Sequence, residues 1–260
     1  MIKVTSNDGT VIGAYHSDTR PPLLLVHGTT ADHSRWLPLI PRLENDFTVY
    51  AIDRRGRGMS GDESEYDISL EGEDIAAVID SIGRSVYVIG HSYGALCCLE
   101  AANRTENIKK MVLYEPPLPN ADWPDISDTV AEIQELSEDG QLEAALELFF
   151  KNVVEMPNDE LSEYRKLPAW KRRIELAPTI SRELKSASSF TFKPEDYADL
   201  HVPSMLLLGG DSPGYFRRAI EDAFAGLPNC MVNVLPDQRH VAMDTAPDLF
   251  VETVFEFFEE

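Results

Sequence analysis

The chain has few of the features that would place it in a membrane or cross-link it. Its 260 residues include only three cysteines, and two of them are adjacent (Cys97 and Cys98), so neither a disulfide framework nor a spaced metal site is expected. No apolar run approaches the ~18 residues that a membrane span needs. The first seven residues, MIKVTSN, contain no apolar block typical of a signal peptide. We therefore expect a soluble, cytoplasmic protein.

Basic residues are scarce relative to acidic ones. The chain has 23 Lys and Arg against 45 Asp and Glu, which gives a net charge of −22. Such a negative field repels nucleic acid and anionic membrane surfaces, so neither is expected as a partner. Two explanations of this excess of acidic residues stay open. The chain is an ordinary acidic protein, or it is adapted to high salt. Apolar residues make up 43% of the chain, enough to bury a large core.

Short apolar runs alternate with helical patterns along most of the chain. The start indicates a hairpin, in which residues 2–5 and 11–15 flank the turn NDG at 7–9. Continuous apolar runs, typical of parallel strands covered on both faces, occur at 23–26, 47–52, 86–89, 111–114, 205–208 and 231–235. Helical patterns occur from Ser69, the expected N-cap, to 82, and at 95–104, 215–227 and 248–258. This alternation predicts a doubly wound, mostly parallel α/β sheet.

One stretch interrupts the alternation. Residues 117–200 contain only helical patterns, at 129–136, 142–154, 160–176 and 179–187. We expect this insertion to form a helical cap over the carboxyl edge of the sheet, where ligands bind in open α/β sheets. The predicted organisation is a core of residues 1–116 and 201–260 with a cap of residues 117–200. The aromatic residues of the cap could line a substrate pocket or form the cap's own core; they are Trp123, Phe149, Phe150, Tyr164 and Trp170.

The sequence GHSYG at 90–94 lies between an apolar strand and a helix rich in small residues. A serine on such a sharp turn has a strained backbone, and its neighbours two positions away must be small for the chain to fold back. The turn would project the hydroxyl above the sheet. The pattern therefore predicts Ser92 as a nucleophile.

A serine nucleophile needs a base, and the base needs an acid that fixes its tautomer. His240 follows the last strand by five residues and precedes the terminal helix, which favours it among the six histidines. Asp211 lies just after the strand at 205–208, and the order Ser92, Asp211, His240 suits this kind of sheet. Glu115, at the end of the preceding strand, is the competing acid. Weaker candidates are Asp237 and Asp244.

An oxyanion hole needs two backbone donors aimed at the developing negative charge. The N–H group of Tyr93, which follows the nucleophile, is one expected donor. The second is expected from the loop HGTT at 27–30, where Thr29 is favoured over Thr30.

Five segments in order resemble the α/β-hydrolase superfamily: LLLVHG (23–28), DRRGRGMS (53–60), GHSYG (90–94), GGDSP (209–213) and HVAM (240–243). The resemblance covers nearly the whole chain. It implies the α/β-hydrolase fold and a serine hydrolase that uses neither a cofactor nor a metal, with the helical insertion as its cap.

A serine at the nucleophile position disfavours the relatives that open epoxides or displace halide from a carboxylate nucleophile. We therefore expect a carboxylesterase, whose substrate is a small to medium apolar ester. Other open activities with the same triad are those of a lactonase, a carbon–carbon bond hydrolase or a perhydrolase. A receptor that binds a small ligand without turnover is the alternative from another class.

Two further patterns have simpler interpretations. GRGMSG at 56–61 fits a dinucleotide fingerprint, but four acidic residues follow and the next helix starts only near Ser69, so a phosphate-binding loop is disfavoured. The basic pair at 54–55 and the basic triplet at 171–173 are interpreted as solvated faces in a strongly acidic chain.

Overall fold

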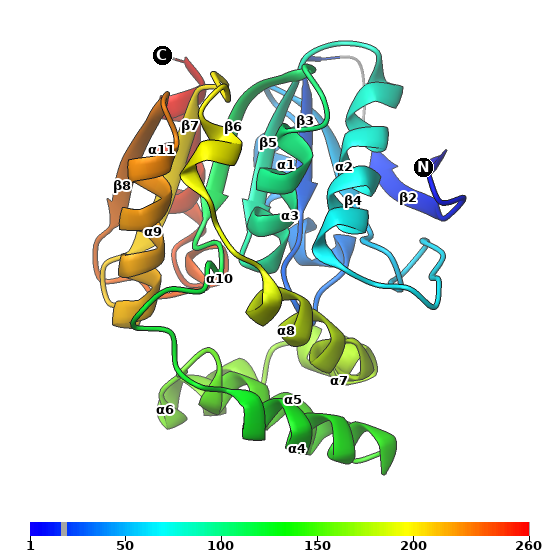
Figure 1. Ribbon diagram of the computed structural model, residues 1–260, viewed down its shortest axis with the longest axis vertical. Helices are drawn as coiled ribbons and strands as arrows, with labels where there is room; N and C mark the ends of the chain where they lie inside the picture. The colour runs from blue at the N-terminus through cyan, green and yellow to red at the C-terminus, as the bar shows by residue number, and fades with distance from the viewer. Residues whose placement is uncertain (17–19, 260) are drawn as a thin grey trace.

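The computed structural model describes residues 1–16 and 20–259, and its strands form one eight-stranded sheet with the order β1-β2-β4-β3-β5-β6-β7-β8 (Figure 1). The predicted hairpin is confirmed, since β1 (Ile2–Thr5) pairs antiparallel with β2 (Val11–His16), with Thr5 opposite Val11. β2 is also antiparallel to β4 (Thr48–Ile52). The remaining neighbours are parallel, namely β3 (Pro22–Val26), β5 (Val86–His91), β6 (Ile108–Tyr114), β7 (Ser204–Gly209) and β8 (Cys230–Leu235).

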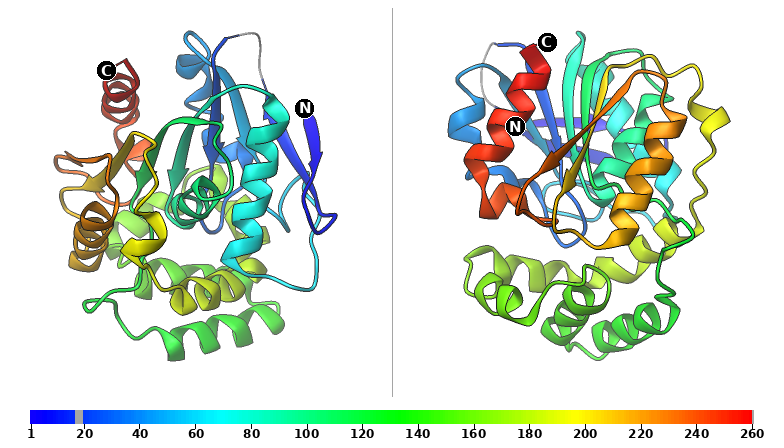
Figure 2. Two further views of the ribbon diagram at one scale, coloured as in Figure 1. Left: turned by 45° about the horizontal axis from the view of Figure 1, so that its top comes forward. Right: turned by 90° about the vertical axis from the view of Figure 1, so that its left-hand side faces the viewer.

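Helices cover both faces of the sheet, as the alternation of apolar runs predicted. Along β3, Leu23 and Leu25 pack into one apolar cluster while Leu24 and Val26 pack into the other. The first cluster includes residues of α1 (Ile40–Leu43), α10 (Ala242–Thr245) and α11 (Pro247–Glu259). The second includes residues of α2 (Ile68–Ile82), α3 (Tyr93–Ala102) and α9 (Gly214–Gly226), so that the sheet lies between two helical layers (Figure 2).

Two local expectations are wrong. The N-cap of α2 is Asp67 rather than Ser69, because the carboxylate of Asp67 accepts a hydrogen bond from the N–H of Leu70 at 3.0 Å. β8 is not covered on both faces, because it is the edge strand, and Val232 and Val234 are 38% and 43% exposed.

The chain between β6 and β7 contains α4 (Ser127–Glu138), α5 (Leu142–Asn152), α6 (Asn158–Tyr164), α7 (Ala169–Leu176) and α8 (Ile180–Ser189), here called the cap helices. They gather at one end of the sheet (Figures 1 and 2). The single helix expected at 160–176 is two helices, because Pro168, the N-cap of α7, lacks the N–H group that would continue α6.

The segment after α8 packs on the core rather than on the cap helices. Tyr197, in the 3₁₀ helix η3 (Pro194–Tyr197), is buried, and its hydroxyl donates a hydrogen bond to Glu100 at 2.7 Å. The predicted division at residues 117 and 200 stays a prediction. Among the described residues, every helix is too short or too polar to cross a membrane.

Candidate active site

Ser92 occupies the single position between β5 and α3. Its φ of 54° and ψ of −126° lie outside the regions that L-residues favour, a strain of about 1–3 kcal/mol. A Cβ on Gly94 would lie 2.4 Å from the carbonyl oxygen of His27, and one on Gly90 would lie 2.6 Å from Cα of Ala95. The steric reason for the two glycines is therefore the predicted one.

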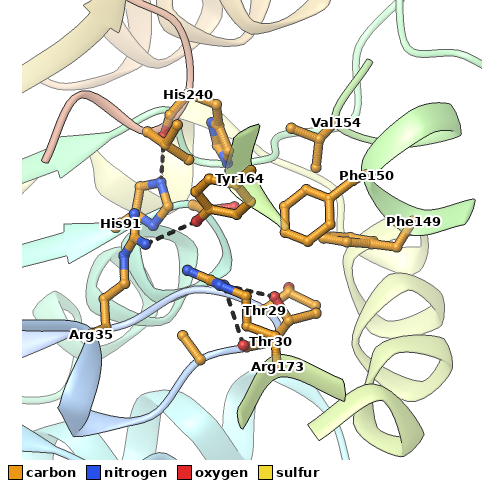
Figure 3. A pocket seen from close by; sticks show the side chains of 13 residues that line it. Thr29, Thr30, Arg35, His91, Phe149, Phe150, Val154, Tyr164, Arg173 and His240 are labelled. Carbon is orange, nitrogen blue, oxygen red and sulfur yellow. Dashed lines mark hydrogen bonds between the residues drawn. The ribbon is translucent and has the colours of Figure 1, made fainter. Parts of the chain in front are cut away.

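Ser92 lines two pockets, which also share Thr29, Phe149, Val154 and His240. Figure 3 shows the one that contains Arg35 and Arg173. The polar pocket also contains Thr30, Arg35, His91, Tyr164 and Arg173. The apolar pocket also contains Tyr93, Trp123, Val153, Leu184 and Phe216. Their volumes are about 20 and 30 Å³, so each has room for a water molecule or two. Both lie between the sheet and the cap helices, because each is lined by residues from both.

The imidazole of His240 is held by a buried carboxylate. Nδ1 of His240 lies 2.5 Å from Oε2 of Glu115, whose side chain is fully buried. The other carboxylate oxygen accepts a hydrogen bond from the N–H group of Gly209 at 2.7 Å. With Nδ1–H donating to Glu115, Nε2 of a neutral His240 is unprotonated and can accept a proton.

Asp211 does not occupy the predicted position. It is exposed at the surface, and the structure brings Glu115, the competing acid, to His240 instead. The backbone of Asp211 is bound to the loop that carries His240: its N–H donates to the carbonyl of Gln238 at 2.9 Å, and the guanidinium of Arg239 donates to its carbonyl at 2.8 Å. The predicted pairing of Asp211 with His240 is therefore corrected to Glu115.

The backbone of His240 is also held in place. Nε2–H of His91 donates to the carbonyl oxygen of His240 at 2.8 Å, and the two rings lie 4.7 Å apart. Burial lowers the pKa of His91 well below its usual value, and His240 acts in the same direction, so His91 is neutral. The hydroxyl of Tyr114 donates to the neighbouring carbonyl of Arg239.

The two predicted oxyanion donors lie at the pockets. Thr29 lines both pockets and Tyr93 lines the apolar one, at the first residue of α3. The loop after β3 approaches the nucleophile closely, because a Cβ on Gly28 would lie 2.9 Å from Cβ of Ser92. The roles of the N–H groups of Thr29 and Tyr93 stay predictions.

The basic pair at 54–55 is buried, so its interpretation as a solvated face is wrong. Arg54 is paired with Glu71 of α2 at 2.8 Å and with Glu183 of α8 at 2.5 Å. Although burial opposes its charge, Glu183 and Glu71 raise the pKa of Arg54 well above its usual value. Arg54 also donates to the carbonyl of His27 at 2.9 Å, which connects a cap helix to the loop that carries Thr29.

The triplet at 171–173 is also not a solvated face throughout. Lys171 is exposed and Arg172 is half-buried, but Arg173 is 6% exposed and lines the polar pocket. Sequence reasoning missed this residue. The available signal was its helical spacing, because Arg173 falls on the same face of α7 as the buried residues Trp170 and Leu176.

Of the cap aromatics, Trp123 and Phe149 line the apolar pocket, and Phe149, Phe150 and Tyr164 line the polar one. Phe149, Phe150, Tyr164 and Trp170 also belong to the buried core. Both open interpretations of these side chains therefore hold.

Residues 53–60 form a loop that folds back on Asp53. The N–H group of Met59 donates a hydrogen bond to the carboxylate of Asp53 at 2.8 Å. Because α2 begins only at Ile68, no helix starts directly after the GRGMSG segment. Within the described chain, Asp32, His33 and Asp53 form one cluster of metal-ligand type. Protein groups already bind both carboxylates: Arg172 pairs with Asp32 at 2.6 Å and His33 binds Asp53 at 2.8 Å.

The comparison with known families agrees with this geometry. The family model described as "Alpha/beta hydrolase family" matches residues 23–253. The chain belongs to the alpha/beta hydrolase family. The fold and the resemblance predicted from the motifs are confirmed, and the relatives support a hydrolase enzyme of this family.

This alpha/beta hydrolase is similar to several known proteins. An alpha/beta hydrolase from Sphaerobacter thermophilus has a solved structure with a TM-score of 0.87 and 32% identity, covering 99% of this chain and 100% of that one. A 2-(acetamidomethylene)succinate hydrolase of Mesorhizobium japonicum is 24% identical over 92% of this chain and 88% of its own. An N-formylmaleamate deformylase of Pseudomonas putida is 34% identical over 37% of each chain.

Proposed function

We propose that this alpha/beta hydrolase cleaves carboxylic esters through an acyl-enzyme intermediate on Ser92, with His240 as the base and Glu115 as the acid that orients it. The observation that carries the proposal is the buried contact of 2.5 Å between His240 and Glu115 beside a pocket that Ser92 lines. The strained backbone of Ser92 supports it, because such strain is concentrated at functional sites.

The proposed reaction has two halves. Nε2 of His240 accepts the hydroxyl proton as Oγ of Ser92 attacks the ester carbonyl, and the N–H groups of Tyr93 and Thr29 bind the oxyanion. His240 then gives the proton to the leaving alcohol, which leaves an ester on Ser92. Water attacks this ester with His240 again as the base, and the acid is released. Glu115 stays ionised throughout and stabilises the imidazolium that forms in each half.

A second candidate is hydrolysis of an acyl group carried on nitrogen. It is favoured by the name of one relative, a deformylase that acts on N-formylmaleamate. The same nucleophile, base and oxyanion donors would serve, with His240 giving its proton to the leaving nitrogen. Matched ester and amide substrates distinguish the two candidates, and faster cleavage of the amide would favour the second.

Turnover of p-nitrophenyl acetate, together with labelling by a fluorophosphonate, tests the proposal. Ser92→Ala is expected to abolish both, while Ser162→Ala, on the exposed side of α6, is expected to keep both. Labelling at a residue other than Ser92 would contradict the nucleophile. If the fluorophosphonate labels Ser92 but the unlabelled protein cleaves p-nitrophenyl acetate once or not at all, the receptor is favoured over the esterase.

A further inference from the structure

Two buried arginines reach the polar pocket from different parts of the fold. Arg35 comes from the 3₁₀ helix η1 (His33–Trp36) of the core, and Arg173 comes from α7 of the cap helices. Figure 3 shows both side chains at the pocket, with the guanidinium of Arg173 beside Thr30. Their relative exposures are 8% and 6%. Two cations are therefore concentrated at one small site in a chain of net charge −22.

Arg173 has no carboxylate partner. Its guanidinium donates hydrogen bonds to the carbonyl oxygen and the hydroxyl of Thr30, at 3.2 and 3.0 Å. Across residues 1–16 and 20–259, no carboxylate forms an ion pair with it. Burial lowers the pKa of Arg173 and the nearby charge of Arg35 also lowers it, whereas Tyr164, Asp244 and Asp32 act in the opposite direction without reversing the shift. The ring of Tyr164, 5.1 Å away, offsets part of this cost through a cation–π contact.

Arg35 is only partly paired. Its Nη1 donates to the carboxylate of Asp244 at 2.7 Å and to the hydroxyl of Tyr164 at 3.1 Å. Its Nε and Nη2 are buried and have no hydrogen-bond partner among the described residues. Buried donors without partners are costly, so they point to a group that binds them.

The chemistry of the pair selects the group. A guanidinium offers N–H donors in a planar fork that matches a carboxylate, and a buried charge is stabilised when its partner is a charge of opposite sign. The apolar pocket, which Ser92 also lines, contains Trp123, Leu184 and Phe216 and has no arginine among its lining residues. The site therefore has one half suited to an anion and one half suited to an uncharged group.

We propose that the polar pocket binds a carboxylate of the substrate, with Arg173 as its main ligand and Arg35 as the second. The preferred substrates are then acyl compounds that carry a carboxylate close to the scissile bond, because Ser92 and both arginines line the same small pocket. This inference rests on the proposed function of Ser92. It departs from the expectation of an apolar ester, because the preferred substrate carries a charged group and only its apolar part occupies the other pocket.

Matched pairs of substrates test the inference, each pair consisting of an ester with a carboxylate and its uncharged counterpart. The rate of hydrolysis is measured from the proton that each cleavage releases. Monomethyl succinate, glutarate and adipate are compared with methyl butyrate, pentanoate and hexanoate, and 4-acetoxybenzoate is compared with phenyl acetate. The two sets place the carboxylate on the acyl side or on the leaving-group side. For one set, kcat/KM is expected to be at least about 10-fold higher for the anionic member.

The arginine is tested by substitution. In Arg173→Met the ratio of kcat/KM between anionic and neutral members is expected to fall by about 10- to 100-fold, and Arg173→Lys is expected to retain part of it. Arg172→Met is the matched control, because Arg172 is the neighbouring residue of α7 but pairs with Asp32 and Glu175. The control is expected to keep the wild-type ratio.

Stability separates binding from a structural role. Because no described carboxylate pairs directly with this buried charge, replacing Arg173 by Met is expected to leave the melting temperature equal or higher. A lower melting temperature together with an unchanged substrate ratio would show a structural role and overturn the inference.

The two proposals fail in different ways. If a fluorophosphonate labels Ser92 and neutral esters are cleaved as well as anionic ones, the inference is overturned and the proposed function stands. If no substrate of either kind is cleaved, the proposed function fails. The inference is then tested by calorimetric titration of Ser92→Ala with monomethyl glutarate and 4-acetoxybenzoate. Binding that Arg173→Met removes would support it, and no binding would overturn it.

Discussion

Glu115 and His240 meet across the strand that separates their own strands. Glu115 follows β6 and His240 follows β8, with β7 between them in the sheet. The loop before His240 must therefore cross the end of β7. Gly209 makes this possible, because a Cβ there would lie 2.7 Å from the carbonyl oxygen of Gln238. The same glycine donates its N–H to Glu115, so the end of β7 supports the pair without supplying the acid.

Replacing each of the two candidate acids by its amide is the sharpest test of this arrangement. Glu115→Gln is expected to lower kcat on p-nitrophenyl acetate by about 10³- to 10⁴-fold, because an amide neither fixes the tautomer of His240 nor stabilises its imidazolium. Asp211→Asn is the matched control and is expected to keep near wild-type activity, because Asp211 contacts the histidine loop through its backbone. An equal loss in both variants would contradict the assignment of Glu115.

The turn at Ser92 gives a prediction about stability. Gly94→Ala is expected to destabilise the protein by about 1–3 kcal/mol, because the new Cβ would lie 2.4 Å from the carbonyl oxygen of His27, an atom of a buried strand end. Gly214→Ala is the control, since a Cβ at Gly214 would meet nothing within 4 Å. Urea unfolding of both variants measures the difference. A Gly94→Ala protein as stable as the control would argue against the close approach of this turn to β3.

Much of the fold follows from sequence patterns that act locally. The apolar runs predicted six of the eight strands, β3 to β8, because strands inside a parallel sheet need continuous apolar residues, and the turn at 7–9 predicted the hairpin of β1 and β2. The strained position of Ser92 between β5 and α3 followed from GHSYG, because the tight turn restricts the residues within it. The exposure of β8 depends on its place at the edge of the sheet, which a run of Met231, Val232 and Val234 does not encode.

The acid and the arginines depend on contacts between distant segments. Glu115 and Asp211 each follow an apolar strand, and only the path of the loop 236–241 over Gly209 decides between them. Arg173 lies in a triplet of basic residues, and its burial depends on the packing of α7 against the loop that contains Thr30. The strong acidity of the chain made a solvated face the simpler interpretation, although the helical spacing of Arg173 with Trp170 indicated the buried side.

Two histidines are expected to affect stability with opposite dependence on pH. Burial lowers the pKa of His91, so the unfolded chain takes up a proton that the folded one does not, and stability falls as the pH drops below about 6.5. The hydrogen bond to Asp53 raises the pKa of His33, so its contribution is complete below about 6.5 and is lost as the pH rises through the folded value.

Urea unfolding of the variants His91→Gln and His33→Gln from pH 5 to 8 measures both effects. The free energy of unfolding of His91→Gln is expected to fall less toward low pH than that of wild type. The free energy of unfolding of His33→Gln is expected to fall less toward high pH than that of wild type. A pKa of His33 at or below its usual value, measured by NMR, would contradict the second expectation.

Leu184 of α8 gives the last prediction, which concerns the apolar pocket. It lines this pocket and is 6% exposed, so Leu184→Ala is expected to enlarge the space beside Ser92. In the series from p-nitrophenyl acetate to decanoate, the variant is expected to favour longer chains than wild type, because each methylene that a pocket accommodates contributes about 1–3 kcal/mol.

Leu161→Ala is the control, because Leu161 is as deeply buried in α6 but lines neither pocket that contains Ser92. Both substitutions are expected to destabilise the fold by about 2–5 kcal/mol, so a common loss of activity reports stability and only a change in the preferred chain length reports the pocket. The same shift in both variants would mean that a loosened cap, rather than the shape of this pocket, sets the preference.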